Sequence, residues 1–350
     1  MATMTEPYTV PKRINNLGHY PTPLEPWPAL GAQLQCELWA KRDDLIGLAF
    51  GGNKTRKLDY IVHDAIKNGA DWLLTTGAPQ SNHCRQTAAA AARNNLGCTL
   101  LLGGPGIRNV TGNLLLDYLM GAEVEWTTTG MHTRNDALEQ AALRLKERGK
   151  SPYIVPLGGS NHLGVWAFVE AVKELAAQLA QAEQTPPDII IIPSSSGGTQ
   201  AGLVLGIALL GWKTRVLGIS VDLPESALQE TILDCIRSAQ SQHPSLKSLA
   251  VPDLWLNDDM TEQEYASFSN EELETLVHTA RTSGVLLDPV YTGRAFAGVK
   301  RIASTHPTLF QNKKILFWHT GGTPALFTYT RPLAAFSDTH PDNIPLKPRQ

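Results

Sequence analysis

Lys54 has the clearest potential for covalent chemistry in this chain of 350 residues. It belongs to segment 51–57, Gly-Gly-Asn-Lys-Thr-Arg-Lys, between a strand-like stretch and a helical one. The glycines permit a close backbone approach or a positive φ, and Asn53 is placed to cap the helix with its side chain. The positive end of the helix dipole disfavours a protonated lysine in the first turn. We therefore expect a lowered pKa for Lys54, which suits Schiff-base chemistry; a solvated lysine in a basic turn is the alternative.

A loop of small residues, Ser194 to Thr199, follows a run of isoleucines and precedes an apolar helical stretch. Small residues expose consecutive backbone N–H groups, which together with the helix dipole suit a phosphate. We expect Ser196, Gly197, Gly198 and Thr199 to bind that phosphate. The loop matches neither the Walker A pattern nor GxGxxG. The alternative is a tight turn in which serine and glycine serve only the geometry.

Polar residues also follow a second strand-like stretch, at Gln80-Ser81-Asn82-His83. At a helix N-terminus, Ser81, Asn82 and the backbone of His83 can hold a carboxylate or a ring oxygen. An N-cap turn without any further function is the alternative, because serine and asparagine are common caps. His83 is assigned only a contact role.

Two later loops add a tyrosine and a threonine. Tyr291 lies between a proline turn and a helix start, where it is either a half-buried core residue or a side chain that stacks on, or protonates, a ligand. Thr320 lies in the sequence His-Thr-Gly-Gly-Thr and can bond a ring nitrogen, with a plain turn as the alternative.

The elements that must position these loops alternate between strand-like and helical stretches. We expect strands at 38–44, 72–76, 99–102, 124–127, 153–155, 189–192, 216–220 and 314–318, and helices at 58–66, 86–94, 113–120, 136–148, 163–182, 199–210, 270–282 and 292–302. This order predicts an α/β fold with right-handed crossovers and mostly parallel sheets. Ligands of such sheets bind at the carboxyl ends of the strands, where all these loops lie.

Three local expectations complete the outline. The apolar run Ile189–Ile192 fits a strand that is covered on both faces, and we expect Pro193 to end it. Residues 1–31 are expected to form an extended arm, and residues 240–264 a long connection.

Composition excludes several classes of function. Apolar residues make up 42% and charged residues 18% of the chain, as in ordinary soluble globular proteins. A formal net charge of −3 provides no basic field for nucleic acid or a membrane surface. The longest apolar run, 201–212, is too short to span a bilayer. Four scattered cysteines without a CxxC pair suggest reduced thiols in a cytoplasmic protein, with no metal site.

A lysine poised for imine formation, a phosphate loop, a carboxylate clasp and a hydroxyl at a strand end are together what a pyridoxal 5′-phosphate (PLP) amino-acid enzyme needs. The same segments resemble the D-cysteine desulfhydrase and aminocyclopropane-carboxylate deaminase family, a branch of the tryptophan-synthase-β-like, fold type II PLP enzymes. The resemblance runs from about Arg13 to Phe327 and rests on 51–58, 80–83, 85–86, 197–202, 287–291 and 319–322.

The resemblance implies two open parallel-sheet α/β domains, PLP as cofactor, a small amino-acid substrate and a homodimer. The larger domain would comprise 1–54 and 158–350 and hold the cofactor phosphate, and the smaller, inserted domain would comprise 55–157. Lys54 would be the Schiff-base lysine, and Tyr265, 26 residues before Tyr291, a second active-site tyrosine. The implied catalytic residues are Lys54, Ser81, Tyr291 and Tyr265; the substrate ligands are Ser81, Asn82 and His83; the cofactor ligands are Asn53, Lys54, Asn82, Ser196, Gly197, Gly198, Thr199, Tyr291 and Thr320.

Two positions separate reactions within the family. The deaminases resemble one another in having Glu at position 292 and Leu at position 320, whereas this chain has Thr292 and Thr320. A neutral hydroxyl cannot hold a protonated pyridine ring by charge, so the cofactor ring would be a weaker electron sink. β-Elimination with a good leaving group tolerates such a sink. The sequence 265–268, Tyr-Ala-Ser-Phe, departs from the family's frequent Tyr-Gly-x-Pro, and Phe50 is more deaminase-like.

The main hypothesis is therefore PLP-dependent β-elimination from D-cysteine to pyruvate, ammonia and hydrogen sulfide. Aminocyclopropane-carboxylate deamination and sulfite elimination from L-cysteate are alternatives in the same family. A protein that binds PLP or an amino acid without turnover is the alternative from another class.

Overall fold

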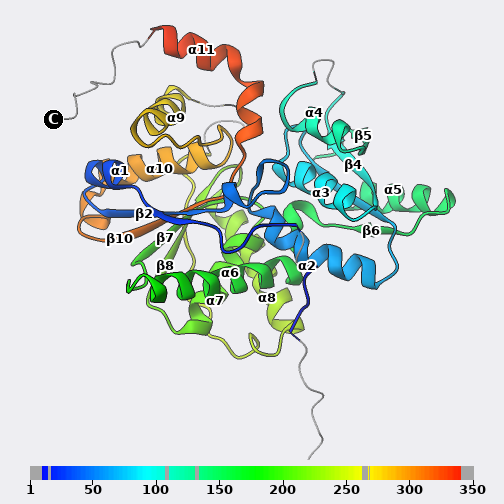
Figure 1. Cartoon of the computed structure of the whole chain (residues 1–350), viewed down its shortest axis with the longest axis horizontal. Helices are drawn as coiled ribbons and strands as arrows, with labels where there is room; N and C mark the ends of the chain where they lie inside the picture. Colours follow the sequence, from blue (N-terminus) through cyan, green and yellow to red (C-terminus); the bar gives the residue numbers. More distant parts are fainter. Residues whose placement is uncertain are drawn as a thin grey trace, which may run out of the picture.

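The chain folds into two α/β units that lie side by side, the smaller one made of the middle of the first half of the sequence (Figure 1). This computed structural model describes residues 10–14, 17–106, 110–130, 134–261, 267 and 269–339. Within these residues the main strands form one six-stranded and one four-stranded sheet. The predicted α/β fold with mostly parallel sheets is confirmed.

The larger sheet has the strand order β1-β2-β10-β7-β8-β9, and only the edge strand β1 is antiparallel to its neighbour. These strands are β1 (Leu24–Pro26), β2 (Glu37–Arg42), β7 (Ile189–Ser194), β8 (Arg215–Ser220), β9 (Trp255–Asn257) and β10 (Lys314–His319). Every residue of β7 and β10 is buried, as expected for parallel strands with helices on both faces.

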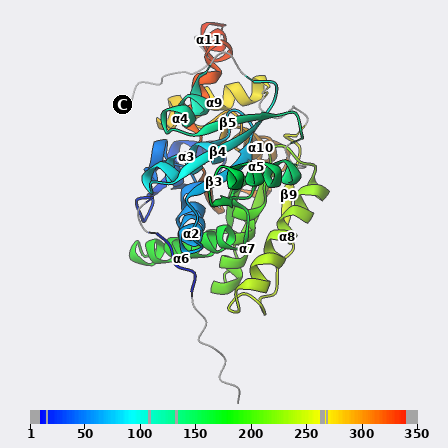
Figure 2. The ribbon, with the colours of Figure 1, turned by 90° about the vertical axis from the view of Figure 1, so that its right-hand side faces the viewer.

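Helices cover the larger sheet on both faces. One face packs against α1 (Pro28–Gln33), α9 (Asn270–Ser283) and α10 (Thr292–Thr305), and the other against α6 (His162–Gln181), α7 (Gly198–Leu210) and α8 (Glu225–Gln242). The described chain ends with α11 (Thr330–Thr339), which lies at the far end of the molecule from α6 to α8 (Figure 2). Both faces of the sheet therefore contribute to the core.

The smaller sheet is entirely parallel, in the order β5-β4-β3-β6. Its elements are β3 (Trp72–Gly77), β4 (Gly97–Gly103), β5 (Glu123–Thr127), β6 (Pro152–Ile154), α3 (Asn82–Arg93), α4 (Gly112–Leu119) and α5 (Asn135–Glu147). Helix α2 (Lys54–Lys67) packs against α6 of the larger unit and α3 of the smaller one, so it lies between the two. The proposed domain limits at 54/55 and 157/158 stay a prediction.

Three sequence expectations are wrong in detail. The expected extended arm contains β1 and α1, and the expected long connection contains the end of α8 and the strand β9. Pro193 does not end β7, which continues to Ser194. Strand β10 pairs with β7 only at Ile189–Ile191, so the N–H that Pro193 lacks falls beyond that pairing.

No helix in the described part of the chain is long and apolar enough to cross a membrane.

Candidate active site

A pocket lies between the two units, where β3, β7 and β10 end and where α2, α3 and α7 begin. The free space within and above it amounts to about 720 Å³, open solvent included. Most of the site residues expected from the sequence line it: Asn53, Lys54, Ser81, Asn82, His83, Ser196, Gly197, Thr199, Tyr291 and Thr320. Gly198 is buried and does not line the pocket, and Tyr265 is outside the described residues.

Lys54 is the first residue of α2, and its half-buried side chain borders this pocket. Burial lowers the pKa of its ammonium group to about 8, and the nearby charge of Asp288 opposes the shift. The direction agrees with the expectation, but burial rather than the helix dipole is the main cause. At neutral pH an appreciable fraction of such an amine is unprotonated and available as a nucleophile or base.

Asn53 does not cap α2 with its side chain, so this expectation is wrong. Its φ and ψ of −58° and −21° are helical, whereas a capping side chain needs an extended backbone. Its amide instead donates to Thr199 Oγ1 at 3.2 Å and accepts from Lys54 Nζ at 3.2 Å. Asn53 therefore joins the lysine to the loop at the end of β7.

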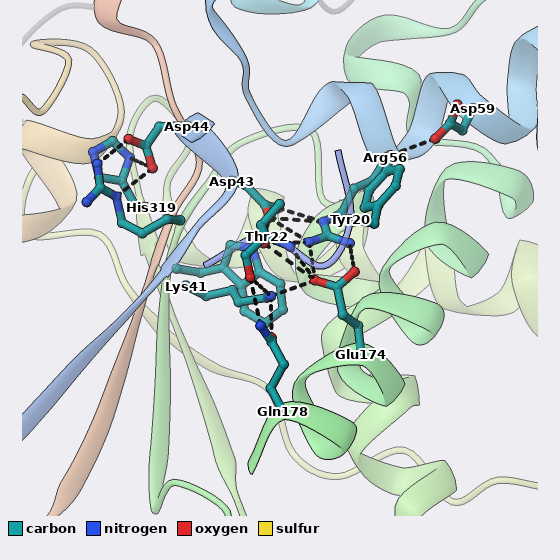
Figure 3. A network of polar contacts seen from close by, with 12 residues as sticks. Tyr20, Thr22, Lys41, Asp43, Asp44, Arg56, Asp59, Glu174, Gln178 and His319 are labelled. Atoms are coloured by element: carbon teal, nitrogen blue, oxygen red, sulfur yellow. Dashed lines mark hydrogen bonds and ion pairs between the residues drawn. The ribbon is translucent and has the colours of Figure 1, made fainter. Parts of the chain in front are cut away.

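The first turn of α2 is anchored by a buried network of charges (Figure 3). The Arg56 guanidinium donates to both oxygens of Asp43 at 3.0 Å and to Glu174 at 2.8 Å, and Lys41 Nζ lies 2.5 Å from Glu174. Burial alone would raise the pKa of Glu174, but Arg56 and Lys41 lower it to about 2. Because Arg56 is two residues from Lys54, this network fixes the helical turn that presents the lysine.

The Ser196–Thr199 loop has the features of an anion cradle. Gly197 has a φ of +75°, and a Cβ on Gly198 would lie 2.7 Å from Ser160 Oγ, so both positions require glycine. Among the described residues, the N–H groups of Ser196, Gly197 and Thr199 have no acceptor. These orphan donors at the start of α7, a helix of 13 residues, fit a phosphate group.

A fully buried lysine supports this loop from behind. Lys57 Nζ donates to Gly158 O at 3.0 Å and to Ser160 Oγ at 3.2 Å. Ser160 Oγ in turn lies 2.9 Å from Ser196 Oγ and accepts from the Gly198 N–H at 3.3 Å. No carboxylate in the described part of the chain pairs with Lys57, and burial followed by the charge of Lys54 lowers its pKa well below the ordinary value. An anion in the cradle would supply the missing negative charge.

The loop before α3 presents a hydroxyl, an amide and an imidazole. Ser81 caps α3, since its Oγ accepts from Cys84 N at 3.2 Å, and its own O–H remains a possible donor to the pocket. Asn82 is half-buried beside it. His83 is buried, with Nε2 2.8 Å from Thr75 Oγ1, and burial, then Lys54 and Lys57, hold its pKa well below the ordinary range. His83 is therefore a neutral contact residue.

The loop before α10 is organised by Asp288, which is completely buried. Its carboxylate accepts from the N–H groups of Val290, Tyr291 and Thr292 at 2.7 to 3.1 Å, and from Thr292 Oγ1 at 2.8 Å. Thr292, one of the two positions that differ from the deaminase pattern, is buried and does not line the pocket. Half-buried Tyr291 does line it.

Two glycine turns bring β10 and α2 together at the pocket. A Cβ on Gly321, whose φ is +86°, would lie 2.8 Å from the Cα of Gly52. The Asn53 N–H also donates to Thr320 O at 3.0 Å, so Thr320 is held beside the first turn of α2. Its side chain borders the pocket.

Known proteins similar to this chain agree with the cofactor that this geometry suggests. A family model described as pyridoxal-phosphate dependent enzyme matches residues 16–321. The chain belongs to this family. It is 39% identical over 320 residues to the D-cysteine desulfhydrase of Klebsiella pneumoniae (strain 342), covering 88% of this chain and 94% of that protein. The crystal structure of an ACC deaminase homologue has a TM-score of 0.84 at 34% identity, covering 93% of this chain and 96% of that one.

A more distant structure shows how far the fold extends. The fungal L-serine ammonia-lyase from Rhizomucor miehei has a TM-score of 0.66 at 18% identity, covering 93% of this chain and 99% of that one. The predicted fold type II and PLP as the cofactor are confirmed by these relatives and by the family match. The pocket fits this cofactor, since it combines a lysine of lowered pKa with orphan N–H donors.

Four residues around the pocket were not found from the sequence: Lys57, Ser160, Asn113 and Asp288. Lys57 is three residues after Lys54, so helical spacing alone places both on one face of α2 and was an available signal. Asp288 stands in the segment 287–291 that carried the resemblance. No local pattern distinguishes Ser160 or Asn113, because their contacts come from distant parts of the chain.

Proposed function

We propose that this protein is a D-cysteine desulfhydrase, which converts D-cysteine to pyruvate, ammonia and hydrogen sulfide. The observation that carries the proposal is that a half-buried lysine of lowered pKa and the N–H donors of the Ser196–Thr199 loop line one pocket. The identity of 39% to a D-cysteine desulfhydrase over most of both chains supports the choice of reaction.

Bound PLP supplies an electron sink for the negative charge that develops at the substrate α-carbon. The residues we assign to hold it are the Ser196–Thr199 loop for its phosphate, through the free N–H groups of Ser196, Gly197 and Thr199, with Asn82 for its ring oxygen and Thr320 for its ring nitrogen. Lys54 is assigned as the covalent attachment point. Asn53 would keep the lysine and the phosphate loop in register through its contacts with Lys54 and Thr199.

The substrate carboxylate is assigned to Ser81, Asn82 and the backbone of His83, at the N-terminus of α3. A carboxylate is stabilised there by the helix dipole and by free N–H groups. His83 is neutral, so it adds a hydrogen bond but no charge. The Ser81 oxygen accepts from Cys84 N, which leaves its own O–H as a donor for the same carboxylate.

The proton transfers are assigned to Lys54 and Tyr291. With a pKa of about 8, the free amine of Lys54 can take the α-proton at neutral pH and give it up again. Tyr291 is assigned as a proton donor, since it lines the same pocket as Lys54. Tyr265 is proposed as a second active-site tyrosine.

The proposal is tested by sulfide release from D-cysteine by the purified yellow protein, with L-cysteine as the paired control. Sulfide from the D-isomer alone is the expected result. Lys54→Ala should abolish turnover, and Lys67→Ala, at the other end of the same helix, is the matched control that should not. Near-normal turnover by Lys54→Ala would remove the assignment of this lysine.

Phe50 and the ACC deaminase homologue favour a second candidate, aminocyclopropane-carboxylate deamination. Product identity separates the candidates, because deamination of that substrate gives 2-oxobutyrate, L-cysteate gives sulfite and D-cysteine gives sulfide. Bound PLP with no keto acid from any of the three would favour a protein that binds the cofactor without turnover.

We also propose a cytoplasmic homodimer. The four cysteines form no disulfide, which supports a reducing compartment. The dimer rests on the resemblance to the family, and its test is the mass of the protein in solution.

A further inference from the structure

The turn that carries Ser81 and Asn82 is hydrogen-bonded to a segment of the smaller unit at the start of α4. The Asn113 N–H donates to Gln80 Oε1 at 2.8 Å, and Gln80 Nε2 donates to Thr111 O at 2.9 Å. Gly112 has a φ of +59°, and a Cβ there would lie 2.5 Å from Gln80 Oε1. The close approach of the two segments therefore depends on glycine at position 112.

The Asn113 side chain also contacts Asn82, which lines the pocket. It is completely buried, and its Nδ2 donates to Gln80 O at 2.8 Å and to Asn82 Oδ1 at 2.8 Å. A backbone carbonyl only accepts hydrogen bonds, so the contact with Gln80 O fixes which end of the Asn113 amide is the NH₂ group. The two hydrogens of that group are then both used.

The orientation of Asn82 follows from this count. Because Asn113 offers a donor, the atom of Asn82 that it meets must be the acceptor Oδ1. The Nδ2 of Asn82 is then turned to the other side, where it lies beside Gly322, close to the end of β10. We propose that Asn113 is a positioning residue that makes Asn82 present its N–H donors, rather than its oxygen, to the cofactor.

This inference rests on the proposed contact between Asn82 and the ring oxygen of PLP. An oxygen of the cofactor needs a donor, and an amide turned by 180° would place an acceptor against it. The Asn82 carbonyl is held separately, since it accepts from Gln86 Nε2 at 2.9 Å. Backbone and side chain of Asn82 are thus fixed from two different elements.

The test is Asn113→Asp, which keeps the shape but offers only acceptors. Asn82 should then rotate to donate to the new carboxylate and turn its oxygen to the pocket. We expect a PLP dissociation constant raised about tenfold, as for the loss of one hydrogen bond, and a shifted visible absorption band of the bound cofactor. Asn94→Asp, at the opposite end of α3, is the matched control and should change neither.

A double-mutant cycle separates positioning from a general structural effect. In an Asn82→Ala background, Asn113→Asp should produce no further change in PLP affinity or absorption, because the group that it orients is gone. An equal loss of affinity in both backgrounds, or a wild-type affinity and spectrum for Asn113→Asp alone, overturns the proposal. If the aspartate variant does not fold, Asn113→Ala removes the same donor without adding charge and gives the same comparison.

These measurements use PLP binding and absorption, with no amino-acid substrate. A wild-type protein that binds PLP but releases no sulfide would therefore contradict the proposed reaction and leave the role of Asn113 intact. The melting temperature of each variant is also measured without cofactor. The proposal predicts that the loss of PLP affinity is larger than the loss of stability accounts for.

Discussion

The Lys54 ammonium group of the cofactor-free protein is expected to be unusually acidic. Burial lowers its pKa from 10.5 to about 8, and Asp288 opposes the shift only in part. At pH 8 about half of the Lys54 side chains would then be neutral, roughly 150-fold more than for a lysine with the ordinary pKa. This neutral fraction decides how readily Lys54 reacts with a carbonyl group.

The lowered pKa of Lys54 also makes the stability of the folded protein depend on pH. The unfolded chain keeps the Lys54 proton up to about pH 10.5, whereas the folded protein keeps it only to about pH 8. The folded state therefore gains stability as pH rises between these values, and below pH 8 the charged lysine costs at most about 3 kcal/mol. Since the side chain is only half-buried, about 2 kcal/mol is the expected gain for Lys54→Met at pH 7.

Both effects are measured on the protein after PLP has been removed. Competitive labelling with an amine reagent over a range of pH, read by mass spectrometry, follows the neutral fraction of each lysine. Lys67, exposed at the other end of α2, is the internal reference. A labelling midpoint for Lys54 above about pH 9.5, together with a Lys54→Met variant that is less stable than wild type, would refute the reasoning.

Two further predictions concern the surroundings of Lys54. Glu174→Gln should lose about 3 kcal/mol of stability at pH 7, because the pKa of Glu174 in the folded protein is about 2. In urea unfolding, the difference in stability from wild type should shrink as pH falls from about 4.5 to about 2. A difference that stays constant over this range contradicts the prediction. Lys57→Met should weaken binding of PLP and inorganic phosphate, but not of pyridoxal, in calorimetric titrations. Equal losses for PLP and pyridoxal would show that Lys57 does not act on the phosphate.

The gathering of the loops was predictable from the sequence. Segments 51–57, 80–83, 194–199 and 319–323 each flank an apolar strand-like stretch, and parallel strands place such loops at one edge of a sheet. In the structure these loops line one pocket. Strand and helix periods sufficed for this, because it depends only on the order of the elements.

Side-chain directions were not predictable in the same way. The Asn53 side chain turns to Thr199 because the backbone of Asn53 is already helical, and no local pattern signals this. Helix α1 was missed because it has only six residues, and β1 because it has three. Helix α8 did carry a signal, since buried Leu228, Ile232 and Ile236 recur every four residues.

Thr292 and Thr320 are residues of the same type in different surroundings. Both differ from the deaminase pattern, but the sequence assigned only Thr320 to the cofactor ring. In the structure the Thr292 hydroxyl donates to Asp288 Oδ1 and accepts from the Asp288 N–H, so its hydrogen-bonding capacity is used inside the protein. Thr320 lines the pocket, and among the described residues only its backbone oxygen has a hydrogen-bond partner, the Asn53 N–H.

Replacement of each threonine by the isosteric valine therefore has different expected results. Thr292→Val should lower the free energy of unfolding by about 2–4 kcal/mol, because it leaves the buried Asp288 N–H without an acceptor and removes one donor from its carboxylate. Thr320→Val should change stability by less than about 1 kcal/mol but alter the visible absorption of bound PLP and the rate of sulfide release. Denaturant unfolding and absorption spectra of the two variants make the comparison. If Thr292→Val changed the absorption while its stability stayed at the wild-type level, the ring contact would belong to Thr292, and both threonines would again bear on the choice between elimination and deamination.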